Sequence, residues 1–361
     1  MTTSNTLFSS VQLGPHTLSN RMVMAPMTRL RATDSIPQPI MATYYAQRAS
    51  AGLIVSECTM VSPLSNGYVD CPGIYTDEQT QAWKPIVEAV HEAGSKIFLQ
   101  LWHCGRVSHP ELLDGELPVA PSAIAGKGTL HTANGKVSLD TPRALETDEI
   151  PGIIEQFCQG AKNARVAGFD GIELHGAFGY LIDQFLQDGS NQRTDQYGGS
   201  VENRARFLLE VVDAVIDVWG SNQVGIKLSP SNTFYGMHDS DPKATFGYVL
   251  EALNLRGLAY VHLMEPNEKD LEQEVLHPVM PLFRPMYQGT LIANGDYDKV
   301  SGNKALAEGQ ADLVSFGKLF LANPDLPERF QQDAELNEPN PRTFYGEGHE
   351  GYTDYPFLEE A

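Results

Sequence analysis

Eight short apolar runs alternate with helical patterns along the chain, and this alternation is what most constrains its fold. The runs cover residues 21–24, 52–57, 96–101, 171–174, 223–228, 260–264, 290–293 and 313–316. Each is short and bounded by turn residues, which is typical of strands buried in a parallel sheet. Eight such strands favour an α/β fold closed as a (β/α)8 TIM barrel. No strand is followed by G-x-G-x-x-G, which argues against an open dinucleotide-binding sheet.

Two segments fall outside the repeating pattern. Residues 7–18 alternate around Gly14 and Pro15, and they predict an N-terminal hairpin, within residues 1–20, that plugs the lower end of the barrel. Residues 108–145 contain several Pro and Gly and show no helical period. They are too long for an ordinary connection, so we expect a functional excursion after the third strand that caps one face. Residues 1–361 then form a single barrel domain.

The composition limits the partners. The 361 residues are 42% hydrophobic, which is enough for a large core, and they carry a net charge of −21. A surface this acidic repels nucleic acid and anionic membranes, and we therefore expect neither as a partner. The four Cys have no metal-binding spacing, the first residues do not resemble a signal peptide, and no apolar run is long enough to span a membrane. We expect a soluble, cytoplasmic protein.

Polar side chains gather where the predicted strands end, which is where barrels of this kind place their active sites. In chain order these ends carry Thr28, Cys58, Gln100 with Trp102, His175 with Tyr180, Lys227, Asn294 with Gly295, and Gly317 with Lys318. The loops after the seventh and eighth strands, with a helix N-terminus, are the usual phosphate site of this fold. We expect that helix to begin near Asn323.

The segment 168–185, GFDGIELHGAFGYLIDQF, carries the strongest local signal. It places His175 at the end of the fourth strand and Tyr180 on the Gly-containing loop that follows. A hydrogen-bond donor and a proton source would then share one rim of the barrel. A structural histidine beside a loop aromatic is the alternative interpretation of this segment taken alone.

Further motifs resemble those of the Old Yellow Enzyme family, the FMN-dependent ene-reductases. They are NRMVMAPMTR, YYAQRASAGLIVSE, QLWHCGR, RTDQYGGSVENRARF, FGKLFLANPDLPERF and EGYTDYP, and with residues 168–185 they extend over nearly the whole chain. Thr28 resembles the branch that has Thr, and not Cys, near the flavin. The resemblance implies a barrel with non-covalent FMN across its top, NADPH or NADH as the reductant, and an enone or related activated alkene as the substrate.

The resemblance also implies the residues of the site. Around FMN it places Pro26, Thr28, Cys58, Gln100, Lys227, Asn294, Gly295, Gly317 and Lys318, and around the substrate it places Tyr68, Trp102, His175, Phe178 and Tyr352. Thr28 and Gln100 would bond the edge of the isoalloxazine ring. Lys227 and Lys318 match family Arg residues beside the flavin N1 and O2 and at the phosphate. Both lysines keep the charge but lose the planar fork of Arg.

The implied reaction reduces a C=C bond. A hydride passes from the nicotinamide to FMN N5 and on to the β-carbon, His175 donates a hydrogen bond to the carbonyl oxygen, and Tyr180 protonates the α-carbon. The family pairs this His with Asn or His three residues later, but Phe178 stands there and has no donor. Loss of one such donor typically lowers the rate by about 100- to 1000-fold. Either His175 acts alone, another group compensates, or the substrate binds in another orientation, and we expect a narrower, more apolar pocket.

Two other functional classes remain open at this point. A metal-dependent barrel hydrolase would draw on His103, His175 and His262, although the first strand has no H-x-H and the eighth strand offers no Asp at its end. A flavin-binding protein with weak turnover would follow from the missing donor at Phe178.

Overall fold

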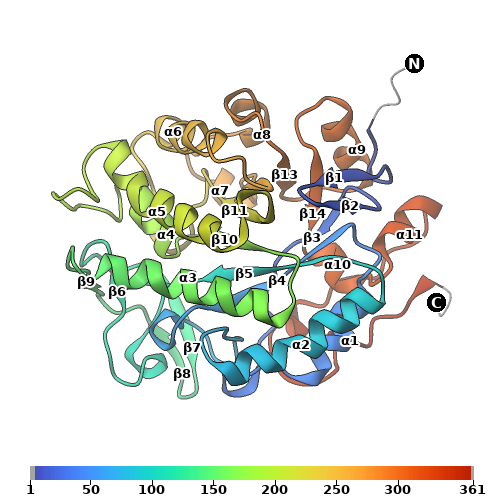
Figure 1. The fold of residues 1–361 in the computed structure, drawn as a ribbon, viewed down its shortest axis with the longest axis horizontal. Helices are drawn as coiled ribbons and strands as arrows, with labels where there is room; N and C mark the ends of the chain where they lie inside the picture. The colour runs from blue at the N-terminus through green and yellow to red at the C-terminus, as the bar shows by residue number, and fades with distance from the viewer. Residues whose placement is uncertain (1–4, 359–361) are drawn as a thin grey trace.

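The computed structural model describes residues 5–358, and its centre is a closed barrel of eight parallel strands in the order β10-β11-β12-β13-β14-β3-β4-β5 (Figure 1). The strands are β3 (Met22–Met24), β4 (Leu53–Met60), β5 (Ile97–Trp102), β10 (Gly171–Gly176), β11 (Val224–Leu228), β12 (Tyr260–Met264), β13 (Leu291–Asn294) and β14 (Leu313–Phe316). The predicted barrel and its eight strands are confirmed. β4 runs further than expected, with an irregular register between Val55 and Cys58.

Helices surround the barrel, and local chemistry sets where they begin and end. They are α1 (Pro39–Gln47), α2 (Asp77–Glu92), α3 (Ile150–Ala167), α4 (Leu181–Leu186), α5 (Val201–Trp219), α6 (Pro242–Asn254), α7 (Glu268–Leu271), α8 (Val279–Phe283), α9 (Lys299–Ala307), α10 (Lys318–Ala322) and α11 (Leu326–Gln332). The Thr76 side chain caps α2 by accepting the N–H of Gln79 at 3.1 Å. α3 ends at Gly168, whose φ of +96° suits a residue without a Cβ. No helix within residues 5–358 is long and apolar enough to cross a membrane.

The expected helix start near Asn323 is wrong. α10 begins at Lys318, directly after β14, and Gly317 is its N-cap residue. Asn323 precedes Pro324 and has extended backbone angles, because the proline ring disfavours a helical conformation in the residue before it. The chain therefore breaks at this point, and α11 starts three residues later at Leu326.

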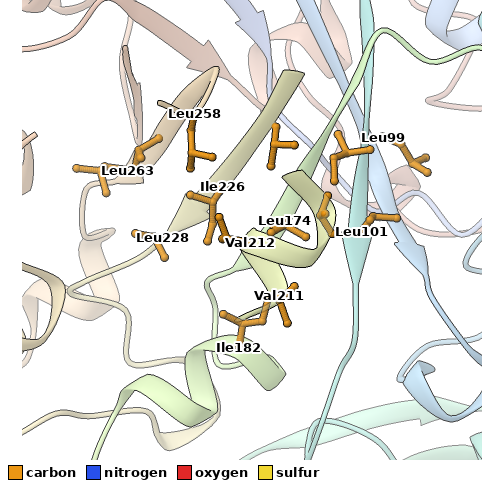
Figure 2. Close-up of a cluster of buried hydrophobic side chains, with 14 of the residues drawn as sticks. Leu99, Leu101, Leu174, Ile182, Val211, Val212, Ile226, Leu228, Leu258 and Leu263 are labelled. Carbon is orange, nitrogen blue, oxygen red and sulfur yellow. The ribbon is translucent and has the colours of Figure 1, made fainter. Parts of the chain in front are cut away.

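The main core lies between the strands and the helices outside them. Figure 2 shows Leu99, Leu101, Leu174, Ile226 and Leu228 of neighbouring strands near Val211 and Val212 of α5 and Ile182 of α4. All of these side chains are at most 1% exposed. Burying an aliphatic side chain of this size contributes about 1.5–3 kcal/mol, so this layer holds the strand ends, and the side chains on them, in fixed positions.

The N-terminal hairpin packs at the amino end of the barrel. It consists of β1 (Val11–Leu13) and β2 (His16–Leu18), and it lies beside α9 and β14 in Figure 1. Leu13 and Leu18 are buried in a cluster with side chains from the strand starts, among them Leu53 and Phe98. A Cβ at Gly14, where φ is +53°, would lie 2.0 Å from the carbonyl oxygen of Asn222, so the turn that reaches this position needs glycine.

The excursion between β5 and α3 contains regular structure that its sequence does not reveal. β6 (Val119–Ala120) pairs with β9 (Arg143–Ala144), and β7 (Thr129–Thr132) forms a hairpin with β8 (Gly135–Ser138). Leu130 and Leu139 pack in one cluster with Trp102, Tyr68 and Tyr180. The hairpin therefore covers the carboxyl ends of β4, β5 and β10.

Candidate active site

Strand register brings the predicted residues together at the carboxyl ends. Gln100 of β5 stands opposite Glu173 of β10 and, on its other side, opposite Cys58 of β4. His175 of β10 stands opposite Lys227 of β11. Residues two apart in a strand share a face, so Glu173 and His175 both point to the same side of the sheet. Side chains from four adjacent strands thus meet on one rim.

His175 is a neutral hydrogen-bond donor. The backbone N–H of Ala177 donates to its Nδ1 at 3.3 Å, so the ring proton of the neutral form lies on Nε2. Burial, followed by the charges of Lys227 and His262, moves the pKa of His175 well below its usual value. Nε2 makes no hydrogen bond to any residue within 5–358, so its N–H is available to a ligand.

Tyr180 lies in an aromatic wall beside His175. Its ring meets those of His175 and Trp102 edge to face, with centroids 4.9 and 5.1 Å apart. Its hydroxyl is 3.0 Å from that of Tyr68. Burial, and then the neighbouring Tyr68 hydroxyl, raises the pKa of Tyr180 well above its usual value. Tyr180 therefore carries its proton at neutral pH, as a general acid must.

Phe178 is next to both His175 and Lys227. Its ring centroid is 6.0 Å from the His175 ring, and Lys227 Nζ lies 5.4 Å from it, in the geometry of a cation–π contact. Its φ is +56°, which is unusual for an aromatic residue. The Phe178 N–H donates to the Ser229 hydroxyl at 2.9 Å, which helps to hold this conformation. A side chain at position 178 therefore lies beside the His175 ring.

A buried polar chain crosses the barrel interior below these residues. Gln100 Nε2 donates to one oxygen of Glu173 at 2.7 Å, and His262 Nδ1 lies 2.9 Å from the other oxygen. His262 Nε2 reaches the Ser315 hydroxyl at 2.7 Å. Burial raises the pKa of Glu173, but His262 and then Lys227 outweigh it and lower the pKa overall, so Glu173 is ionised. The sequence offered one signal for it, since Glu173 is a charged residue inside an otherwise apolar strand.

Lys227 is the cation above this chain. It is 3% exposed and forms no ion pair within 4 Å with any carboxylate of residues 5–358. Burial lowers its pKa, while the charge of Glu173 opposes that shift. A buried ammonium group without a close partner is costly, so this position suits an electron-rich ligand atom. This matches what the resemblance implies for the flavin pyrimidine edge.

The first and second strands supply small polar groups on the other side of Gln100. Cys58 Sγ donates to Gln100 Oε1 at 3.0 Å. Burial raises the pKa of the Cys58 thiol to about 12, although a hydrogen bond with Thr28 opposes the shift. Pro26 and Thr28 follow β3 and are half-buried. With Gln100 Nε2, which has a second N–H, they form a polar edge that a flavin ring could occupy.

The loops after β13 and β14 fit a phosphate. Asn294 is buried at the end of β13, and Gly295 follows with a φ of +152°. An added Cβ at Gly317 would meet nothing within 4 Å, so the backbone there faces open space. Lys318 is exposed and starts α10. The donor groups and the space therefore agree with the expected phosphate end of FMN.

Tyr352 belongs to a different cluster. It is fully buried and stacks on Tyr44 with centroids 4.0 Å apart, and the guanidinium groups of Arg29 and Arg31 lie 4.9 and 4.3 Å from its ring centroid. None of the aromatic pairs within residues 5–358 joins it to Tyr68, Trp102 or Tyr180. The structure thus brings the other predicted aromatic residues together but separates Tyr352 from them.

The three histidines of the hydrolase alternative do not form a metal site. His262 uses both ring nitrogens on Glu173 and Ser315. His103 Nδ1 accepts the N–H of Gly105 at 3.0 Å, and burial lowers its pKa to about 3. Within the described part of the chain, no three His, Cys, Asp or Glu side chains gather around one point.

Sequence and structure comparisons give a consistent result. A model of the NADH:flavin oxidoreductase / NADH oxidase family matches residues 6–337. 12-oxophytodienoate reductase 1 from Oryza sativa subsp. japonica is 49% identical over 98% of this chain and 93% of its own length, and 12-oxophytodienoate reductase 2 from Arabidopsis thaliana is 46% identical over 98% and 96%. These relatives support neither the metal-dependent hydrolase nor the weakly active flavin-binding protein.

Solved structures agree. Morphinone reductase superposes with a TM-score of 0.95 at 50% identity, covering 99% of this chain and 97% of its own. A complex of morphinone reductase with tetrahydroNAD has a TM-score of 0.93 at 51% identity, with 98% of both chains covered. The old yellow enzyme homologue from Zymomonas mobilis has a TM-score of 0.95 at 43% identity, covering 98% and 100%.

The loop that carries Tyr180 depends on a buried carboxyl group, and this predicts a pH effect on stability. Asp183 accepts the N–H of Gly179 at 2.9 Å and Gln187 Nε2 at 2.8 Å. Burial raises its pKa from 3.8 to about 7. A carboxyl whose pKa is raised on folding contributes stability below pH 4 that is lost as the pH rises through 7.

We therefore expect Asp183→Asn to flatten the pH dependence. Between pH 5 and pH 8 the free energy of unfolding of the parent should fall by about 2–3 kcal/mol more than that of the variant. Urea unfolding at the two pH values measures this. Asp114→Asn, at an exposed turn, controls for the loss of one carboxylate. Equal pH dependence in parent and Asp183→Asn would contradict the expectation.

Proposed function

Because the chain belongs to the NADH:flavin oxidoreductase / NADH oxidase family, we propose that it is an FMN-dependent ene-reductase that reduces the C=C bond of α,β-unsaturated carbonyl compounds. The observation that carries the proposal is the pair formed by the free Nε2–H of His175 and the protonated hydroxyl of Tyr180, whose rings are 4.9 Å apart. NADPH or NADH is the reductant, which the complex of morphinone reductase with tetrahydroNAD supports. When bound, FMN supplies the redox chemistry by accepting a hydride from the nicotinamide and delivering it to the β-carbon.

The side chains on the rim polarise and protonate the substrate. His175 donates Nε2–H to the carbonyl oxygen, where negative charge develops during reduction, and this donor lowers the barrier most if it is already in place. Tyr180 gives its hydroxyl proton to the α-carbon. The Trp102 ring packs edge to face against the Tyr180 ring, and the Tyr68 ring packs against Trp102 in turn.

The remaining predicted residues hold the cofactor. Thr28, Cys58 and Gln100 line one polar edge, with Pro26 before them, and Lys227 supplies the positive charge. Asn294, Gly295, Gly317 and Lys318 take the phosphate. Tyr352 lies apart from the aromatic wall. Its ring holds the C-terminal segment against Arg29 and Arg31, so its role is structural.

The acidic charge of −21 supports small-molecule substrates over nucleic acid as partners. We place the protein in the cytoplasm, where the nicotinamide reductant is available and its free thiols stay reduced. The names of relatives that act on 12-oxophytodienoate and morphinone support a bulky enone as the substrate class.

The role of Tyr180 is tested by separating the two half-reactions. Tyr180→Phe removes the proton donor but leaves the nicotinamide step intact. In rapid-mixing absorbance measurements, flavin reduction by NADPH should match the parent. Flavin oxidation by 2-cyclohexenone should slow by at least about 100-fold, the usual contribution of a general acid. Equal rates of enone-dependent oxidation would exclude Tyr180 as the donor.

Phe178 generates a second prediction. Phe178→Asn adds an amide N–H beside His175 and suits a φ of +56° better than Phe does. The hydrogen bond from this amide to the substrate carbonyl oxygen strengthens as that oxygen becomes anionic, so enone-dependent flavin oxidation should become faster. Phenolate ligands mimic the developing charge and should bind more tightly. Rapid mixing and an absorbance titration measure the two effects.

Phe178→Leu is the matched control, because it removes the ring without adding a donor. A gain in the Asn variant alone identifies the missing donor as the cause. An equal gain in both variants would show that the bulk of the ring is what limits the reaction. No change in either would reduce Phe178 to loop packing.

A further inference from the structure

Three tyrosine hydroxyls form a chain that begins at Tyr180. The Tyr68 hydroxyl is 3.0 Å from that of Tyr180 and also hydrogen-bonds that of Tyr235. The three residues come from three loops, those after β4, β10 and β11. Sequence patterns did not single out Tyr235.

Counting protons shows what such a chain can do. Three hydroxyls carry three protons, and the two bonds between them use two. When Tyr235 donates to Tyr68 and Tyr68 donates to Tyr180, the third proton lies on Tyr180 and points away from the chain. That is the arrangement in which Tyr180 can protonate a substrate.

The residue at the far end of the chain borders the molecular surface. Tyr235 is half-buried and borders a surface hollow of about 490 Å³. Lys127, His238 and Gln273 line the same hollow and are all exposed. The hydroxyl chain therefore connects Tyr180 with a residue that borders a polar hollow on the surface.

The loop of Tyr235 is held in an unusual conformation. Its φ is +56°, which costs free energy for a residue with a side chain. Its carbonyl oxygen accepts the N–H of Lys127 at 2.9 Å, from the excursion that covers the site. Asp270 accepts the N–H and hydroxyl of Thr233 at 2.9 and 2.8 Å. These contacts fix where the Tyr235 hydroxyl lies.

The energetic need for the chain follows from burial. Loss of its proton to the substrate would leave Tyr180 as a buried phenolate, and burial raises the pKa of both Tyr180 and Tyr68 well above the usual value. Burial raises the pKa of Tyr235 too, but less far. Moving protons along the chain therefore transfers the negative charge to the tyrosine that holds it at the lowest cost, at the edge of the hollow.

We propose that Tyr235 and Tyr68 form a proton relay that resupplies Tyr180 from solvent. This inference rests on the proposed reductase function. As Tyr180 gives its proton to the α-carbon, it receives the hydroxyl proton of Tyr68, and Tyr68 receives that of Tyr235. Tyr235 then takes a proton from water in the hollow, so one solvent proton reaches the substrate and every hydroxyl is restored.

The test uses Tyr235→Phe, which removes one hydroxyl and keeps the ring. Enone-dependent flavin oxidation should slow by about tenfold, a fraction of the whole general-acid contribution, while flavin reduction by NADPH stays as in the parent. The parent rate should curve when plotted against the fraction of D₂O, because several protons move together, and the curve should be flatter in the variant. In a Tyr68→Phe background, where the chain is already cut, Tyr235→Phe should slow the reaction no further.

Tyr75→Phe is the control. Tyr75 is half-buried in the same cluster, and its hydroxyl makes no hydrogen bond to the described residues, so this variant should behave as the parent. An unchanged rate in Tyr235→Phe would overturn the relay, and so would a slower rate with the D₂O curve of the parent or an added effect in the Tyr68→Phe background. A parent protein whose reduced flavin is not oxidised by the enone would instead overturn the proposed function itself.

Discussion

The buried carboxylate of Glu173 is the constraint on which the site depends. An ionised carboxylate inside a barrel is tolerated only when partners satisfy both oxygens, and Gln100 and His262 do so. This arrangement fixes the orientation of the Gln100 amide, so that its oxygen faces the Cys58 thiol. It also supplies the negative charge that makes a buried Lys227 acceptable. The buried charge of Glu173 therefore determines how the polar side chains below the site are oriented.

Residues along β10 and the loop that follows it have different roles. Glu173 lies in the polar chain below the site, and the proposed roles of His175 as donor to the carbonyl oxygen and of Tyr180 as proton source fall within the same eight residues. Asp183 and Ser229 hold the loop by accepting the N–H groups of Gly179 and Phe178. Phe178 has a positive φ that is unfavourable for a residue with a side chain, so these bonds help the loop to keep its shape.

Much of this could be predicted from the sequence, because strand periodicity and strand-end chemistry are local signals. The eight strands and the places of His175, Tyr180, Gln100 and Lys227 follow from them. The link between Glu173, His262 and Ser315 could not be predicted, because it joins three strands distant in sequence. The strands of the excursion escaped notice because they are two to four residues long. Tyr235 was missed because only the meeting of three loops gives it a role, and the break before α11 was missed although Pro324 signals it.

The most direct test of the central claim, that this rim polarises and protonates an enone, is where isotopes enter the product. Reduction of 2-cyclohexenone with NADPH in D₂O, followed by NMR of the product, should give cyclohexanone with one solvent deuteron at the α-carbon. Nicotinamide deuterated at its hydride position should, in H₂O, place deuterium at the β-carbon. An allylic alcohol with cofactor deuterium on the carbonyl carbon would contradict the account.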